Sequence, residues 1–237
     1  MSDQIEFLWE QLPNLLWGFP DRRPGGLLLS LLLSSGAIAV GFIFGSALAL
    51  ARHARRRAVR FVADRVVWAI RGVPLLVLLV LLFQFLGTGA WFGIELSAFW
   101  SAAVTLSLYA GAYLSDVMTA GIGAVPRQLV DDARLLGAGP ITAARTVTLP
   151  YALRTMRPAL VTQAVTVFKD SSVVVVLGVS DLTTNARIAL GGDVGNTPYW
   201  VATYLLVGFL YWIVAFAVGR LAENRHGRGP QVVGAHA

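Results

Sequence analysis

Residues 24–51 read PGGLLLSLLLSSGAIAVGFIFGSALALA, a run of 28 residues without a charged side chain. Because about 20 apolar residues let a helix cross the hydrocarbon core of a bilayer, this run predicts a transmembrane helix. Its Gly41 and Gly45 have the GxxxG spacing, which supports close helix packing somewhere in the protein. Of the 237 residues, 56% are hydrophobic and only 14% are charged. The expected fold class is therefore an all-α membrane protein.

Four further stretches continue the apolar pattern, namely 72–94, 96–115, 158–180 and 194–219. Three of them carry no charge, and the stretch 158–180 is interrupted only by Lys169 and Asp170. Each is long enough to span a bilayer as a helix. We expect five transmembrane helices that form a single domain over residues 1–237.

The arginines indicate how these spans are oriented. Fifteen lie after the first span, between the third and fourth spans, or after the fifth, and only three lie on the other side. Because arginine and lysine concentrate in cytoplasmic loops, we expect the N-terminus outside and the C-terminus inside. The fifteen are Arg52, Arg55, Arg56, Arg57, Arg60, Arg65, Arg71, Arg127, Arg134, Arg145, Arg154, Arg157, Arg220, Arg225 and Arg228, and the three are Arg22, Arg23 and Arg187.

The ends of the chain suit this orientation. Residues 1–26 are predicted to form an external amphipathic segment, in which Trp9 and Trp17 suit a membrane interface. The segment contains acids, and the apolar run after it is longer than a signal core, so we expect no cleavable signal peptide. Residues 221–237 are expected to form a cytoplasmic tail.

Residues 125–158, VPRQLVDDARLLGAGPITAARTVTLPYALRTMRP, are too polar to span the membrane and too apolar for a free loop. Apolar residues recur at near-helical spacing over 129–136, and Gly137–Gly139 end the run. Pro140 suits the start of a second helix, which would end before Leu149–Pro150. The spacing leaves two interpretations open, a compact cytoplasmic knob and an interfacial hairpin that only joins two spans.

Common catalytic and metal-binding motifs are absent from the sequence. Walker A needs a Gly-Lys pair, but the only lysine is Lys169. There is no His-Glu-x-x-His and no Gly-x-Ser-x-Gly. The chain has no cysteine, and its three histidines lie in basic or terminal segments, so no metal or cofactor is expected. The arginines flank spans, so no nucleic-acid partner is expected.

The cytoplasmic segment resembles the EAA motif of bacterial ABC importer permeases, which reads EAA, three residues, Gly, nine residues, Ile, one residue and Leu-Pro. The matching positions are Asp131, Asp132, Ala133, Gly137, Val147, Leu149 and Pro150. Every interval is kept. Asp131 and Val147 are conservative departures, whereas Asp132 replaces an alanine and could alter the docking surface.

Five flanking segments narrow the resemblance. RGVPLL, AYLSDV, AGIGAVP and FKDSS with GVSDLT resemble RGTPLL, AYLAEV, GGIQSVP and LKDTSL with GVPELT of polar amino-acid permeases, and they begin at Arg71, Ala112, Ala120, Phe168 and Gly178. The likeness runs from residue 26 to residue 220. The chain is identified as a member of the histidine, glutamate, glutamine and arginine class of ABC importer membrane subunits.

This resemblance implies a transport subunit of the bacterial inner membrane that is not itself an enzyme. The implied partners are two ATP-binding cassette ATPase subunits, a second permease subunit (itself or a paralogue), an extracytoplasmic substrate-binding protein and membrane lipid. The ATPase subunits would dock on coupling helices at 129–148, between the third and fourth spans. The residues implied to couple are Asp131, Asp132, Ala133, Gly137, Leu149 and Pro150.

Lys169 and Asp170 lie near the middle of the span 158–180. Ionised side chains at that depth cost a few kcal/mol, so both are expected to face protein or water. A free amino acid carries a carboxylate and an ammonium, for which a lysine and an aspartate are complementary. We therefore predict that Lys169, Asp170 and the adjacent Ser171 bind substrate; the alternative is a structural ion pair.

The charges also suggest a substrate class. With one acid in the pair, a dedicated site for cationic amino acids is disfavoured, so glutamate, aspartate or a neutral polar amino acid is expected. Opines or other organic solutes are the alternative within transport. Outside transport, the alternatives are a scaffold or an intramembrane enzyme that would use Asp116, Lys169 and Asp170.

Overall fold

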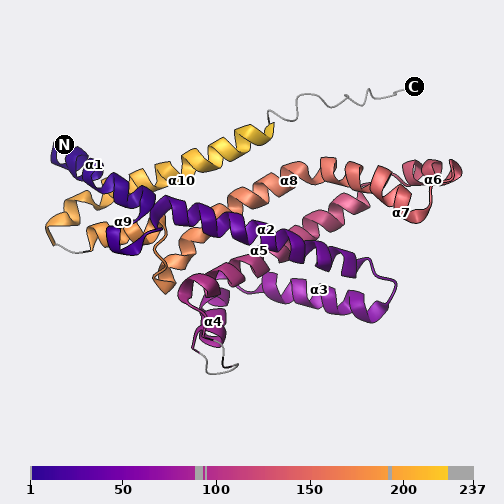
Figure 1. Ribbon diagram of the computed structural model, residues 1–237, viewed down its shortest axis with the longest axis horizontal. Coiled ribbons are helices and arrows are strands. Elements are labelled where there is room, and N and C mark those ends of the chain that lie inside the picture. Colours follow the sequence, from indigo (N-terminus) through magenta and orange to yellow (C-terminus); the bar gives the residue numbers. More distant parts are fainter. Residues whose placement is uncertain (1, 89–92, 94, 192–193, 224–237) are drawn as a thin grey trace.

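The computed structural model describes residues 2–88, 93, 95–191 and 194–223, and it consists of helices joined by short loops (Figure 1). Within those ranges there is no β-strand, only an isolated bridge between Gly26 and Asp181. The expected all-α class is confirmed. The α-helices are α1 (Ser2–Trp17), α2 (Gly26–Arg52), α3 (Arg57–Gly72), α4 (Leu75–Gly87), α5 (Ala98–Gly123), α6 (Arg127–Leu135), α7 (Pro140–Ala143), α8 (Leu149–Asp170), α9 (Leu182–Leu190) and α10 (Trp200–Glu223).

The centre of the molecule is the crossing of α2 and α5, which pack along much of their length (Figure 1). A Cβ atom added at Gly41 would lie 2.9 Å from the Cβ of Ala110. One added at Gly45 would lie 2.7 Å from the carbonyl oxygen of Gly111. Only glycine lets the two backbones approach this closely. The GxxxG spacing therefore marks a real helix crossing.

The main hydrophobic core surrounds this crossing. It takes side chains from α2, α4, α5, α8 and η3, the 3₁₀ helix Ser171–Leu177 that follows α8. One buried residue from each is Leu33, Leu79, Leu106, Val167 and Val174. Inside a bilayer, such packing is stabilised mainly by close contact, because lipid tails are as apolar as the side chains.

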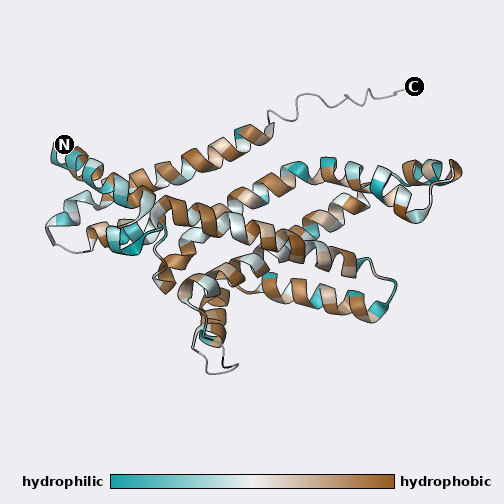
Figure 2. Ribbon diagram, viewed as in Figure 1, coloured by the Kyte–Doolittle hydropathy of each residue, from teal (hydrophilic) through white to brown (hydrophobic). Residues whose placement is uncertain are grey.

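Long apolar helices are visible as the brown stretches along α2 and α10 in Figure 2. Within the described residues, three stretches are long and apolar enough to cross a membrane: Gly26–Arg52, Pro140–Leu177 and Trp200–Ala222. The α3–α4 pair makes a fourth if it is counted as one bent span. α5 has 26 residues but falls outside this group, because serine, threonine and tyrosine lower its hydropathy. The number of five spans stays a prediction.

The span predicted for 72–94 is not one straight helix. Its main described part is α4, whose 13 residues extend about 20 Å, and α4 is bent by 107° from α3. Pro74 explains the bend, because it forces the preceding Val73 into an extended conformation with φ −102° and ψ 131°. Residues 89–92 and 94 of that span lie outside the described residues.

The prediction that the second cytoplasmic helix ends before Leu149–Pro150 is wrong. α7 passes through a π-helical turn, Ala144–Thr148, directly into α8. The N–H of Leu149 donates to the carbonyl oxygen of Ala144, five residues back. Pro150 follows this turn in α8 and has no N–H to donate, so the π turn is where the continuous helix accommodates the proline. The proline therefore continues the helix and does not stop it.

α1 and α9 lie at the end of the molecule opposite to α6 and α7 (Figure 1). Leu15 of α1 and Leu182 of α9 are fully buried in one cluster, and the side-chain amide of Asn185 donates to the carbonyl oxygen of Asn14 at 3.0 Å. Trp17 remains more than half exposed, so α1 has the amphipathic character expected of it. Residues 224–237 of the predicted tail lie outside the described residues.

Candidate functional site

Lys169 and Asp170 lie where α8 passes into η3, but their side chains face different parts of the molecule. Lys169 is exposed and Asp170 is half-buried. Successive residues of an α-helix point about 100° apart. The four ion pairs formed within the described part of the chain include neither residue. The structural ion pair considered from the sequence is thus not formed among those residues.

Lys169 lines a groove of about 500 Å³ between α8 and α10. Thr162 and Thr166 line the same wall, and their spacing puts the three side chains on one face of α8. Both threonine hydroxyls donate to backbone carbonyls of α8, at 3.1 and 2.9 Å. The opposite wall carries the small residues Ala215 and Gly219. The groove therefore presents one ammonium at the end of a mildly polar strip.

Asp170 belongs to a second polar group, which is centred on α5. The hydroxyl of Tyr109 donates to that of Tyr113 at 3.3 Å, and the guanidinium of Arg71 lies 4.8 Å from the centre of the Tyr113 ring. Asp170 and Arg71 lie within electrostatic range of the Tyr109 hydroxyl, although no hydrogen bond joins Asp170 to a tyrosine among the described residues. This group therefore combines a carboxylate, a guanidinium and two phenols.

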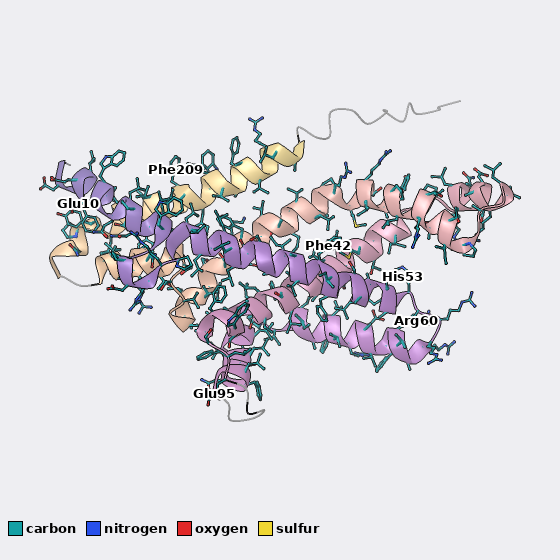
Figure 3. All side chains as sticks on the ribbon, viewed as in Figure 1. Glu10, Phe42, His53, Arg60, Glu95 and Phe209 are labelled. Atoms are coloured by element: carbon teal, nitrogen blue, oxygen red, sulfur yellow. The ribbon has the colours of Figure 1, made fainter. Side chains whose placement is uncertain are left out.

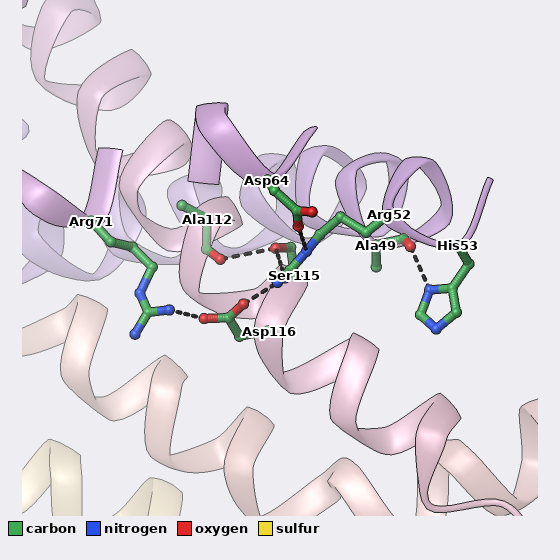
Figure 4. A network of polar contacts seen from close by, with 8 residues as sticks. All are labelled: Ala49, Arg52, His53, Asp64, Arg71, Ala112, Ser115 and Asp116. Carbon is green, nitrogen blue, oxygen red and sulfur yellow. Dashed lines mark hydrogen bonds and ion pairs between the residues drawn. The ribbon is translucent and has the colours of Figure 1, made fainter. Parts of the chain in front are cut away.

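Arg71 extends this group into a chain of four charged side chains (Figure 4). Its guanidinium pairs with one carboxylate oxygen of Asp116. The other oxygen of Asp116 pairs with Arg52 at 2.5 Å, and Arg52 pairs with Asp64 at 2.8 Å. Two positive and two negative charges alternate, so the chain has no net charge. It fastens α2, α3 and α5 together beside the bend between α3 and α4.

Ser171, the third residue predicted to bind substrate, is fully buried. Its hydroxyl donates to the carbonyl oxygen of Phe168 at 2.7 Å. A solute could reach it only if the packing around η3 opened. The structure thus places Lys169 in the groove, Asp170 near the tyrosines and Ser171 beneath the surface.

The segment around α6 and α7 projects from the end of the molecule opposite to α1 (Figure 1). Gly137 ends α6 with φ +86°, in the left-handed region. The N–H of Gly137 donates to the carbonyl oxygen of Arg134, and the N–H of Ala138 donates to that of Ala133. This is a Schellman motif, which needs a residue that tolerates positive φ. The helix, glycine break and second helix expected from the sequence are present.

The α6–α7 hairpin, residues 127–143, carries large apolar side chains that the described part of the chain does not cover. Leu135 is 86% exposed, Leu136 is 89% exposed and Ile141 is 70% exposed. An apolar patch of this kind on a projecting element usually marks a contact with another molecule. The hairpin is therefore a candidate docking surface.

The residues that match the EAA motif lie on or next to this hairpin. Asp131 and Asp132 are exposed, and Asp131 pairs with Arg134 at 3.8 Å. Ala133 is half-buried, whereas Leu149 and Pro150 are exposed in the first turn of α8. Their role in ATPase coupling stays a prediction.

Sequence reasoning did not bring Arg71, Tyr109, Tyr113 and Asp116 together as one site. The sequence predicts Arg71 in a cytoplasmic loop, but in the structure it lies in the last turn of α3, which packs against α5. Tyr109 and Tyr113 are four residues apart, a spacing that places them on one helix face. This spacing inside an apolar span, together with Asp116, is the feature of the sequence that could have indicated the site.

The fold is that of an ABC transporter permease. A crystal structure described as that of an amino acid ABC transporter with histidines matches with a TM-score of 0.77 and 26% identity, over 94% of this chain and 96% of that chain. An inward-facing structure of the MetNI methionine ABC transporter has a TM-score of 0.62 at 20% identity, over 93% of this chain and 95% of that chain, which supports the fold alone.

Residues 37–225 match the family described as binding-protein-dependent transport system inner membrane component. This chain belongs to that family. Its members are transport subunits and the ATPase is a separate protein, so the prediction that this chain is not an enzyme is confirmed at the level of the family. Its resemblance to amino-acid ABC importer permeases is also confirmed, because the curated relatives carry such names.

Three of these relatives show the range of identities, of coverages and of named solutes. The inner membrane amino-acid ABC transporter permease protein YhdY of Escherichia coli is 30% identical over 85% of this chain and 55% of its own length. The putative glutamine transport system permease protein GlnP of Rickettsia conorii is 32% identical over 84% of this chain and 88% of its own. The arginine transport system permease protein ArtQ of Bacillus subtilis is 28% identical over 84% and 90%. The chain thus spans about half the length of YhdY and most of the other two.

Proposed function

We propose that this chain is the permease subunit of an ABC importer that carries a polar L-amino acid across the inner membrane of a bacterium. The names of the relatives support an amino acid as the solute. Lys169 and Asp170 offer one cation and one anion, which favours glutamate, aspartate or a neutral polar amino acid over a cationic one. An opine or another organic solute is the alternative.

The observation that carries this function is the projecting α6–α7 hairpin. Its exposed Leu135, Leu136 and Ile141 suit the groove of a partner protein, and the residues of the EAA-like motif lie beside them. We infer that each of two ATPase subunits binds one such hairpin. Movement of the hairpin would pass through the π turn into α8, whose 22 residues extend about 33 Å and end at Asp170.

We infer a topology of five spans with the N-terminus outside. The spans would be α2, the stretch 72–94 (which contains α4), α5, α8 with η3, and α10. Figure 3 shows Glu10 near one end of the molecule, and His53 and Arg60 toward the end that carries the hairpin. The positive-inside rule counts only arginine and lysine, so the position of Arg60 on the hairpin side is what it requires if the hairpin is cytoplasmic.

The α8–α10 groove would face a second permease subunit, either a copy of this chain or a paralogue. Lys169 would then line a path between the two subunits, while Asp170 and the tyrosines of α5 border it. An extracytoplasmic binding protein would deliver the solute at the α1–α9 end.

ATP-driven uptake in liposomes tests this function. The permease is reconstituted with its ATPase subunits and binding protein, and uptake of labelled glutamate, aspartate, glutamine, arginine and an opine is compared. Uptake of one of the first three is expected. Uptake of arginine or the opine alone would overturn the substrate class, and flux without ATP would overturn the importer.

The same assay tests Lys169 and Asp170. Lys169 and Asp170 are adjacent and the lysine charge acts on the aspartate, so the single variants Lys169→Met and Asp170→Asn are compared with the double variant. Each single change should lower uptake at least roughly tenfold. Arg154→Gln removes an exposed charge of α8 outside the groove and should leave uptake near normal. Near-normal uptake by the double variant, at unchanged membrane abundance, would exclude both as solute ligands.

A further inference from the structure

The three arginines on the side expected to be external converge at one end of the molecule. Arg22 and Arg23 lie between α1 and α2, and Arg187 lies on α9. Arg22 and Arg187 line the same cleft of about 630 Å³, whose walls also include Ile188 and Trp200. Residues more than 160 positions apart in the chain are thus brought to one hollow.

The only charged side chains among the described residues that line the cleft are the two arginines, Arg22 and Arg187. No aspartate or glutamate among the described residues lines it. Arg22 and Arg187 are exposed and take part in none of the four ion pairs of that part of the chain. Asp181, at the start of α9, is fully buried and accepts the N–H groups of Thr183 and Thr184. A concave surface lined by one sign of charge concentrates its field and attracts anions.

The size and position of the cleft suit a small solute. Its volume lies within the range of about 300–1,000 Å³ typical of ligand pockets, and a hollow favours a small molecule over a flat protein surface. Val175 and Gly178, at the end of η3, line it. η3 has seven residues and so extends about 14 Å, and it begins directly after Asp170. One short helix therefore links the cleft to the Lys169 and Asp170 region.

We propose that this cleft is an entry site for an amino acid with two carboxylates, one on Arg22 and the other on Arg187. The inference rests on the proposed import function and narrows its substrate to the glutamate and aspartate class. A dicarboxylic amino acid carries net negative charge, so the two arginines would hold it at the outer mouth before it moves toward the inner site.

The absence of cysteine from the sequence gives a direct test. Ile188→Cys places a single thiol in the cleft of the permease, which is held in lipid nanodiscs without ATPase. Its reaction rates are measured with a thiosulfonate reagent that carries a sulfonate and with one that carries a trimethylammonium group. The two arginines should favour the anionic reagent on the order of tenfold at low ionic strength.

Two variants and a competition assay complete the test. Arg22→Gln combined with Arg187→Gln should abolish the preference, whereas Arg23→Gln, a neighbouring charge that does not line this cleft, should keep it. Millimolar L-glutamate or L-aspartate should slow the anionic reagent at least threefold, and L-glutamine or L-arginine should not.

Equal rates for the two reagents, or equal protection by glutamine and glutamate, would overturn the entry site. Protection by the binding protein alone, with no effect of free amino acids, would overturn it in favour of a protein contact. Because these rates need neither ATP nor transport, a negative result here leaves the uptake assay of the proposed function unaffected, and a failed uptake assay does not change these rates.

Discussion

The α2–α5 crossing and the α6–α7 hairpin use glycine and large apolar residues in opposite ways. At the crossing, an added Cβ at Gly45 would meet the backbone of α5 at 2.7 Å, and at Gly137 it would meet nothing within 4 Å. Leu106 in the core is 1% exposed, whereas Leu136 on the hairpin is 89% exposed. The first region is completed by the chain itself. The second leaves its large apolar side chains exposed, as the proposed docking of an ATPase subunit requires.

The largest effect is expected from a substitution at the α2–α5 crossing, because only this region is tightly packed. Gly45→Leu would force α2 away from α5 and should destabilise the fold by about 3 kcal/mol or more. Membrane abundance, and the monodisperse fraction after detergent extraction, should fall at least roughly tenfold. Gly36→Leu adds the same side chain to α2 where nothing lies within 4 Å, and it should be tolerated. Equal abundance of the two variants would show that the crossing is not tightly packed.

The second prediction concerns the hairpin, where folding should be unaffected and binding lost. Leu135→Asp with Leu136→Asp should weaken ATPase association by about 2 kcal/mol, or about 30-fold, and change thermal stability by less than about 0.5 kcal/mol. Co-purification and titration with the ATPase subunit measure this. Val59→Asp places a new acid at a partly exposed apolar residue of α3 and is the matched control. Full ATPase affinity in the double variant would exclude the hairpin as the docking surface.

The sequence was informative where a local pattern has one physical cause. The charge-free run at 24–51 predicts α2, and the glycine at 137 ends α6 as its conformational freedom predicts. The GxxxG spacing indicates a close crossing, but nothing in α2 identifies α5 as the partner, because helix pairing depends on long-range packing.

Two features could not be predicted because they depend on packing over distance. Pro74 indicates a break, but whether α4 continues straight or turns by 107° depends on what α3 packs against. Likewise, Arg71 and Asp116 are 45 residues apart and meet only after α3 folds back onto α5. The separation of Lys169 from Asp170 follows from helical geometry, yet the groove that receives Lys169 is made by α10.

The third prediction tests the chain of four charged side chains formed by Arg71, Asp116, Arg52 and Asp64. This chain lies on the same side of the α2–α5 crossing as the hairpin. Asp116→Asn leaves Arg52 and Arg71 without their shared carboxylate and should lower stability by about 1–2 kcal/mol. The effect is smaller than for a deeply buried pair, because Asp116 is 33% exposed. Asp64→Asn removes a carboxylate that is 56% exposed and should cost less than about 0.5 kcal/mol. Thermal unfolding in detergent measures both changes. Equal losses of stability in the two variants would contradict the role of Asp116 as the shared partner of Arg52 and Arg71.

The smallest expected effect is at Gly137, where the change is one of backbone conformation and not of packing. Because φ is +86° and no atom lies within 4 Å of an added Cβ, Gly137→Val is opposed only by local strain, of about 1–2 kcal/mol. That strain should disturb the Schellman turn and the angle between α6 and α7 while the core stays intact. Membrane abundance should therefore be normal, and the ratio of uptake to ATP hydrolysis should fall about two- to fivefold. Gly137→Asn is the control, because asparagine tolerates positive φ better than other residues with a side chain, and it should retain most of the coupling. If valine and asparagine impaired coupling equally, the glycine would be needed for close approach of the ATPase and not for its φ angle. If neither did, the turn would have no part in coupling.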